Sequence, residues 1–177
     1  MKPEVISTES IYKGRIFEVS LDSLREGGIE YKREIISHHG SAVIIPVFAD
    51  KTIALVKQYR HAARKYLWEI PAGSLEKDED AKAGAARELE EEIGVAARKI
   101  EKISEFYVSP GFLSEKMFVF LATDLTETAQ NLEADELIEV KRFTFPQAFE
   151  MIRQGDIEDA KTIIGLVLAG LRFGYVL

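Results

Sequence analysis

The sequence predicts an α/β (α+β) sandwich with a mixed sheet, preceded by a small antiparallel β unit. Short runs of β-type residues, divided by turn residues, fill the first forty positions and recur through the middle of the chain. Three other segments have the residue spacing of helices. A chain of 177 residues has room for a substantial core. We therefore expect an N-terminal β appendage over residues 1–40 and a main domain over residues 41–177.

The N-terminal unit is expected to contain three short strands. Glycine-containing turns at Lys13–Gly14 and Glu26–Gly28 separate them, because glycine tolerates the backbone angles of tight turns. The expected strands are Ile11–Tyr12, Ile16–Leu21 and Tyr31–Ile36.

The main domain begins with the dense apolar run Ser41–Phe48, which is typical of a strand buried on both faces. A turn at residues 49–51 leads into a strand at Thr52–Arg60. Helices packed against such strands form a sandwich. The remaining expected strands are Leu67–Pro71, Ile100–Val108, Lys116–Ala122 and Glu139–Phe145, and the expected helices are residues 80–93, Pro146–Gln154 and Lys161–Phe173.

The composition narrows the classes of function. Hydrophobic residues make up 46% and charged residues 30%, as in globular proteins. A net charge of −7 argues against a nucleic-acid partner, because binding a phosphate backbone requires clustered lysine and arginine. The absence of cysteine excludes disulfides and thiolate zinc sites. No stretch resembles a signal peptide or a membrane span, so we expect a cytoplasmic protein with no membrane partner.

The helix expected at residues 80–93 has an acidic side. Glu88, Glu91 and Glu92 occupy positions i, i+3 and i+4, so they share one face. Like charges at this spacing repel each other, and a cation among the carboxylates would relieve the repulsion. Ala81, Ala85, Leu89 and Ile93 recur at helical spacing and predict a packed face.

Two glycines bracket this acidic helix. Gly94 follows the last periodic residue and predicts a left-handed C-cap. Gly73, in the segment Pro71–Ser74, allows the backbone to approach a ligand closely and can leave carbonyl oxygens free to bind a metal ion. Loop and helix together therefore predict one oxygen-rich pocket.

The segment Gly73–Val95 resembles the Nudix box, G-x5-E-x7-R-E-U-x-E-E-x-G-U, where U is an aliphatic residue. The fixed positions are occupied by Gly73, Glu79, Arg87, Glu88, Leu89, Glu91, Glu92, Gly94 and Val95. The alternative interpretation is a glutamate-rich surface helix, but the arginine and both glycines also match the motif. The resemblance implies the α/β/α sandwich of Nudix proteins.

The same resemblance implies a metal site. Its expected ligands are Glu88, Glu91, Glu92 and the carbonyl oxygen of Ala72, which would hold Mg²⁺ or Mn²⁺, with more than one ion bound. Arg87 would orient the glutamates, and Glu79 would support it. His38, His39 and His61 have no ligand at metal-motif spacing, so we interpret them as structural or solvated.

Features outside the box resemble the ADP-ribose pyrophosphatase branch of the family. Pro110 and Gly111 lie at the offset of a substrate loop, although a simple turn explains the same dipeptide. Arg60 is expected to contact the diphosphate or ribose, the alternative being a surface ion pair. Arg33 and Glu34 resemble a strand that reaches the adenine end of the substrate, and in an edge strand such charges also prevent aggregation. Glu115 is expected near the terminal sugar.

An acidic segment before the last strand resembles the loop that activates water in this branch. Glu136 matches best as general base and Glu133 second, while solvated loop acidity explains both equally simply. The catalytic set expected from the resemblance is Glu136, Glu133, Glu91 and Arg87. The resemblance also implies a homodimer in which the N-terminal strands pair and help to build the substrate site.

The expected function is metal-dependent hydrolysis of the diphosphate linkage of ADP-ribose to AMP and ribose 5-phosphate. One alternative is a Nudix hydrolase that prefers GDP- or UDP-sugars, since the groups that select the base cannot be placed from the sequence. A second is a non-catalytic ADP-ribose sensor. The intact set Glu88, Glu91 and Glu92 argues against the sensor, which does not need every metal ligand.

Overall fold

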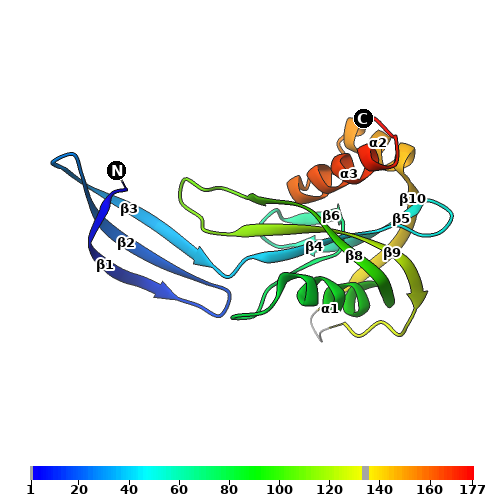
Figure 1. Cartoon of the computed structure of the whole chain (residues 1–177), viewed down its shortest axis with the longest axis horizontal. Helices are drawn as coiled ribbons and strands as arrows, with labels where there is room; N and C mark the ends of the chain where they lie inside the picture. Colours follow the sequence, from blue (N-terminus) through cyan, green and yellow to red (C-terminus); the bar gives the residue numbers. More distant parts are fainter. Residues whose placement is uncertain (1, 133–135) are drawn as a thin grey trace.

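A computed structural model describes residues 2–132 and 136–177. Figure 1 shows a body of strands and helices from which a separate N-terminal sheet extends. This sheet, here called the arm, contains β1 (Glu4–Lys13), β2 (Phe17–Glu26) and β3 (Ile29–His38), antiparallel and in that order. The expected N-terminal antiparallel unit is therefore confirmed. Its strands are longer than predicted, because β1 is exposed along its whole length and its polar residues carry little alternation to detect.

The body contains a four-stranded mixed sheet in the order β7-β4-β9-β8. Its strands are β4 (Ser41–Pro46), β7 (Ala72–Ser74), β8 (Val95–Tyr107) and β9 (Lys116–Glu127). Strands β4 and β9 are parallel, and the other pairs are antiparallel. This arrangement confirms the mixed sheet predicted from the sequence.

Every residue of β4 is buried, because helices cover both faces of this sheet. Ala42 and Ile44 pack in a cluster with Leu89 of α1 (Ala81–Ile93). Val43 and Ile45 point the other way and join the larger core, which includes Leu166 of α3 (Ala160–Arg172). Successive residues of one strand therefore serve two cores, as the unbroken apolar run predicted.

A second sheet is antiparallel, in the order β10-β5-β6. It consists of β5 (Thr52–Arg60), β6 (Lys65–Glu69) and β10 (Ile138–Thr144), and α2 (Phe145–Gln154) follows it directly. Ile53 and Leu55 of β5 add to the larger core together with Phe145. The body is thus the expected α/β sandwich. Strand β8 begins at Val95 instead of the predicted Ile100, strand β9 ends at Glu127 instead of the predicted Ala122, and the short strand β7 was not predicted.

Helix α1 is fixed at both ends. Asp80 is its N-cap and accepts hydrogen bonds from the backbone of Lys82 at 3.1 Å and of Ala83 at 3.0 Å. Gly94 has φ 63° and ψ 43°, the left-handed C-cap predicted from the sequence. Strand β8 begins at the next residue, Val95, so the chain turns directly from the acidic helix into the sheet.

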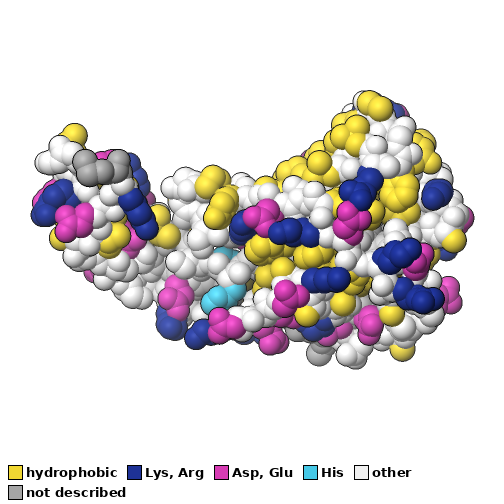
Figure 2. All heavy atoms as spheres, viewed as in Figure 1, with side chains coloured by type: hydrophobic (Ala, Val, Ile, Leu, Met, Phe, Trp, Pro, Cys, Tyr) yellow, Lys and Arg dark blue, Asp and Glu magenta, His cyan; other side chains and the backbone are white. Residues whose placement is uncertain are grey.

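The arm joins the body through the end of β3. The amide of Ile36 donates to the carbonyl of Phe112 at 2.7 Å, and the amide of Ser114 donates to the carbonyl of Ile36 at 2.9 Å. In Figure 2, lysine and arginine side chains are interspersed with acidic ones over the visible face of both arm and body. Within the described residues, no helix has the length and apolar character needed to cross a bilayer.

Candidate functional site

The acidic side of α1 packs against the backbone of β7. Glu92 is only 3% exposed, and its Oε2 accepts a hydrogen bond from the amide of Ala72 at 3.1 Å. Glu88 is 8% exposed, and a Cβ at Gly73 would lie 1.9 Å from its Oε1. The close approach that Gly73 allows is therefore to a carboxylate of α1. Only glycine leaves room for that carboxylate at this position.

Arg87 connects the glutamates of the motif. Its guanidinium donates to Glu79 at 3.2 and 3.3 Å, to Glu88 at 2.6 Å and to Glu91 at 2.9 Å. Glu79 in turn accepts from the amide of Glu76 at 2.8 Å, which ties the preceding loop to the cluster. Arg87 thus has the contacts that an orienting residue needs, and these ion pairs raise its pKa further.

Burial disfavours the charged form of two carboxylates in this cluster. Loss of solvent, reinforced by the charges of Glu88 and Glu136, raises the pKa of Glu92 to about 8. Burial also raises the pKa of Glu88, despite the opposing effect of Arg87. The charge of Glu136 acts on both groups, so this loop residue lies close enough to the cluster to interact with it. A bound cation would relieve the repulsion among these carboxylates.

The donor set suits a hard divalent cation, because it consists of carboxylate and backbone oxygens. In the parts of the chain that the structure describes, no three acidic or histidine side chains already meet as a metal site. Glu88 and Glu91 instead contact Arg87, and Glu92 contacts the amide of Ala72. Metal binding by these residues therefore requires their carboxylates to exchange these contacts for the ion.

Arg60 lies at the edge of the same site. Its Nε and Nη2 each donate to the carboxylate of Glu69 at 2.8 Å, and its side chain is 40% exposed. Glu69 and the nearby charge of Glu92 raise the pKa of Arg60. The ion pair expected as the alternative is present, but its carboxylate is buried, and the Arg60 side chain remains partly exposed.

Sequence reasoning missed the residues behind Arg60. Glu69 is 1% exposed and is also bound by the ammonium of Lys161 at the start of α3. Lys161 pairs with Asp159 at 3.0 Å, and Thr162 hydrogen-bonds the amide of Ile70 at 2.9 Å. Glu69 itself was the available signal, because it lies inside the apolar run of residues 67–70. A buried glutamate without a partner would be very costly, so a cationic partner was to be expected.

The other candidate residues of the body lie around the end of β3. Pro110 and Gly111 form a turn in which the amide of Leu113 donates to the carbonyl of Ser109 at 2.9 Å. Glu115 accepts a hydrogen bond from Oγ of Ser41 at 2.6 Å. Both features therefore lie where the arm meets the body.

Arg33 and Glu34 belong to the arm, whereas the carboxylates of α1 belong to the body. Both are exposed in the middle of β3, in the part of the arm that extends away from α1 in Figure 1. Arg33 lies over the ring of Tyr31, 4.5 Å from its centroid. Glu133 lies outside the described residues, so the structure places only Glu136 of the two expected bases.

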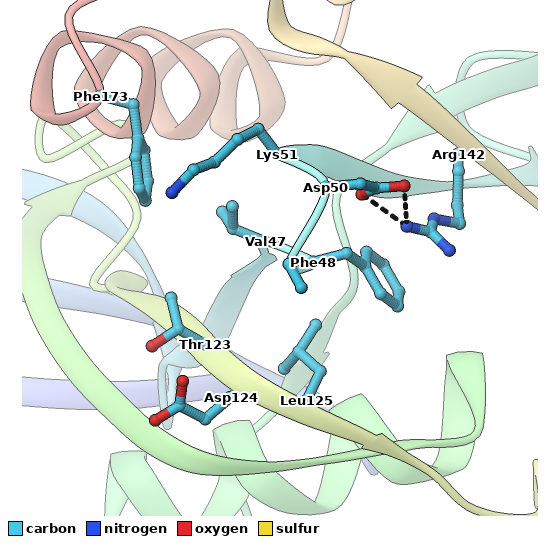
Figure 3. Close-up of a pocket in the computed structure, with 10 residues that line it drawn as sticks. Val47, Phe48, Asp50, Lys51, Thr123, Asp124, Leu125, Arg142 and Phe173 are labelled. Atoms are coloured by element: carbon cyan, nitrogen blue, oxygen red, sulfur yellow. Dashed lines mark hydrogen bonds and ion pairs between the residues drawn. The ribbon is translucent and has the colours of Figure 1, made fainter.

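A separate hollow of about 440 Å³ opens at the opposite end of β5 (Figure 3). It is lined by Val47, Phe48, Ala49, Asp50, Lys51, Thr123, Asp124, Leu125, Arg142 and Phe173. Both of its carboxylates are paired with cations, Asp50 with Arg142 at 2.7 Å and Asp124 with Lys99 at 3.0 Å. This hollow has no excess of negative charge to attract a metal ion, so the carboxylate cluster on α1 is the candidate site.

The fold is shared with a solved structure. A crystal structure described as that of an ADP compounds hydrolase matches with a TM-score of 0.86 at 21% identity, covering 98% of this chain and 95% of that one. The fold and the acidic side of α1 together define an α/β sandwich with a carboxylate-lined candidate site. The family model for the NUDIX domain matches residues 38–164, and the chain belongs to the Nudix family.

Three relatives, each with a different name, are similar in sequence to most of this chain. An ADP-ribose pyrophosphatase of Bacillus subtilis (strain 168) is 38% identical, over 92% of this chain and 89% of its own. A methanol dehydrogenase activator of Bacillus methanolicus is 37% identical, over 92% and 90%. A GDP-mannose pyrophosphatase of Escherichia coli O1:K1 / APEC is 32% identical, over 84% of each chain. The expected family is therefore confirmed, and Nudix hydrolases in general use divalent metal ions.

Proposed function

We propose that this protein hydrolyses the diphosphate linkage of ADP-ribose, giving AMP and ribose 5-phosphate. The observation that carries the proposal is the pair of buried carboxylates, Glu88 and Glu92, held against Ala72 and Gly73 beside the cation of Arg60. Buried acids next to an accessible guanidinium suit a substrate that carries a diphosphate and binds with metal ions. The similarity to an ADP-ribose pyrophosphatase supports this choice of substrate.

The ligands of this metal site would be Glu88, Glu91, Glu92 and the carbonyl of Ala72, holding more than one ion of Mg²⁺ or Mn²⁺. Bound divalent ions supply charge neutralisation for the diphosphate and make a water molecule more acidic. Arg87 keeps the glutamates oriented through its contacts with Glu79, Glu88 and Glu91.

Residues of this chain position the substrate and accept the proton of the attacking water. Arg60 directs its free guanidinium N–H group to the diphosphate. Glu136 accepts the proton of the attacking water, and its electrostatic influence on Glu88 and Glu92 supports this position; Glu133 is the second candidate. Glu115, with Pro110 and Gly111, contacts the terminal sugar.

We further propose a homodimer built through the arm. A sheet of three long strands with both faces open to solvent has no core of its own, and such sheets need a covering surface. The exposed apolar side chains of the arm include Val5, Ile6, Ile11, Tyr12, Ile16, Phe17 and Ile29. In a dimer, Arg33 and Glu34 of one copy would reach the adenine end of the substrate in the other.

In this proposal, residues 1–40 form the dimerisation appendage and residues 41–177 the hydrolase domain. A cytoplasmic location and the lack of a nucleic-acid partner stay predictions. The alternative substrates are GDP- and UDP-sugars, and the similarity to a GDP-mannose pyrophosphatase supports the first of these.

The experiment that tests the function is turnover with Mg²⁺ on ADP-ribose, GDP-mannose, UDP-glucose and a nucleoside triphosphate, with the released monophosphate measured. We expect a clear preference for ADP-ribose, with AMP and ribose 5-phosphate as products. Equal rates on the sugars would broaden the function to general cleavage of nucleotide sugars. Tight binding of ADP-ribose without turnover would contradict the hydrolase and support the sensor.

A further inference from the structure

A buried lysine joins the last helix to the strand that leads into the metal site. Lys161 is 8% exposed, and its ammonium contacts Glu69 and, at 3.0 Å, Asp159. Burial alone would raise the pKa of Glu69, but the hydrogen bond from Arg60 and the charge of Lys161 hold it below its ordinary value. Glu69 is therefore a charged group held between two cations in the interior of the body.

The start of α3 also binds the backbone of Ile70, the residue that follows Glu69. The hydroxyl of Thr162 donates to Asp159 at 2.6 Å and accepts a hydrogen bond from the amide of Ile70 at 2.9 Å. Two residues later, the amide of Ala72 donates to Glu92. Contacts therefore continue from the start of α3, through residues 69–72, to a carboxylate of the metal site.

Glu69 also determines how Arg60 is presented. Both of its carboxylate oxygens bind the guanidinium, at 2.8 Å each, so the direction of Arg60 depends on the orientation of Glu69. Lys161 contacts Oε2, the oxygen that also accepts from Nη2 of Arg60. A shift of Glu69 would therefore move both the guanidinium and the start of the loop that contains Ala72.

We propose that Lys161 is a positioning residue for the hydrolytic site, acting with Thr162 from the start of α3 to hold Glu69 and Ile70. This fixes Arg60 for the diphosphate and Ala72 for the metal ion. The proposal rests on the function proposed above. A residue that only joined helix to strand would not need burial, because the exposed pair Lys65 and Glu158 already joins β6 to the segment before α3.

The test compares Lys161→Met with the matched control Lys65→Met, which breaks an exposed lysine–glutamate pair between the same parts of the chain. Binding of Mn²⁺ to the metal-free protein is measured by electron paramagnetic resonance, and kcat and KM are measured at saturating Mg²⁺. We expect Lys161→Met to weaken Mn²⁺ binding or lower kcat by about 10–100-fold, as the loss of groups that orient a metal site does. Lys65→Met should change either value less than about twofold. Unchanged Mn²⁺ binding and kcat in folded Lys161→Met would overturn the proposal.

Removing Lys161 alone leaves Glu69 with one cation and can prevent folding. The double variant Lys161→Met/Glu69→Gln removes both buried charges of the pair. It should fold and still show the loss in Mn²⁺ affinity or kcat. Recovery of both to wild-type values in this double variant would show that the pair has no positioning role.

Thr162 offers a second, nearly isosteric test. Thr162→Val keeps the shape of the side chain but removes the hydroxyl that binds Ile70, whereas Thr162→Ser keeps the hydroxyl and removes a methyl group. A positioning role predicts weaker Mn²⁺ binding in the valine variant than in the serine variant. The opposite order would show that packing alone matters.

These results separate the two proposals. If wild-type protein cleaves no nucleotide sugar while Lys161→Met still weakens Mn²⁺ binding, the proposed function fails and the role of Lys161 in positioning the metal site stands. If wild-type protein cleaves ADP-ribose and the Lys161 and Thr162 variants match it in Mn²⁺ affinity and kcat, the function stands and the positioning role is wrong.

Discussion

Oε2 of Glu92 accepts a hydrogen bond from the amide of Ala72 at 3.1 Å, which joins the acidic helix to the strand beside it. This contact places a nearly fully buried carboxylate next to the residue whose carbonyl we expect to share the same metal ion. It also offsets part of the effect of burial on the pKa of Glu92. The helix and the strand β7 therefore act as one unit in the proposed site.

Replacing Glu92 with Gln should lower turnover of ADP-ribose by orders of magnitude while the fold persists. The amide keeps the size of the side chain but removes a charged oxygen ligand. Circular dichroism would confirm the fold, and kcat would be measured at several Mg²⁺ concentrations. Near-normal turnover at saturating Mg²⁺ would show that Glu92 is not a ligand.

The metal-free protein should lose stability as the pH rises from about 4.5 to about 8. The pKa of Glu92 is about 8 in the folded protein and near 4.5 when exposed, so folding favours its protonated form. Its contribution is complete below pH 4.5 and is lost as the pH rises through about 8. Glu92→Gln should remove the part of this pH dependence that comes from Glu92 and raise Tm at pH 8.5 in EDTA, by roughly 2–4 °C for each kcal/mol of stability gained.

The control for that measurement is Glu90→Gln, which changes an exposed glutamate of the same helix. Thermal unfolding of both variants and wild type would be followed from pH 5 to 9. Equal pH dependence of Tm in Glu92→Gln and wild type would contradict the raised pKa.

Glu136→Gln should slow the chemical step while leaving metal affinity largely intact. A general base acts on the attacking water, and its neutral amide cannot accept the proton. The measurements are single-turnover rates with ADP-ribose and Mn²⁺ binding to the free protein. A collapse of Mn²⁺ affinity would instead identify Glu136 as a metal ligand.

Gly73→Ala should disrupt the metal site from the strand side. The added Cβ would lie 1.9 Å from Oε1 of Glu88, so the carboxylate or the strand must move. We expect weaker Mn²⁺ binding and a fall in kcat of about tenfold or more, as for other changes that displace ligands. Ser74→Ala, at the exposed neighbouring position, is the control, and equal effects of the two changes would contradict the steric explanation.

Ile11→Glu should weaken the proposed homodimer. Ile11 is 58% exposed on the arm, and a charge there opposes burial against a second copy. Sedimentation velocity would measure the mass of wild type and variant, with Lys13→Gln as an exposed control on the same strand. A monomeric wild type would refute the dimer.

Local sequence patterns were sufficient to determine most of the fold and the composition of the acidic helix. Residues 41–48 predicted a strand buried on both faces, and β4 is buried on both faces because its alternate residues enter two cores. Gly94 predicted a left-handed cap and forms one, since that conformation depends on the residue itself and its immediate neighbours. The Nudix family followed from the motif Gly73–Val95 for the same reason, because its residues are fixed in a short segment.

The tertiary structure alone decided which charges from distant segments meet. Glu69 and Lys161 are separated by 92 positions, and their pairing depends on how α3 packs on the body, which no local pattern encodes. The contact of Gly73 with the carboxylate of Glu88, instead of with a ligand, was decided in the same way. Periodicity and caps act over a few residues and can be read from the sequence. Buried ion pairs join distant segments, and only the folded chain brings their partners together.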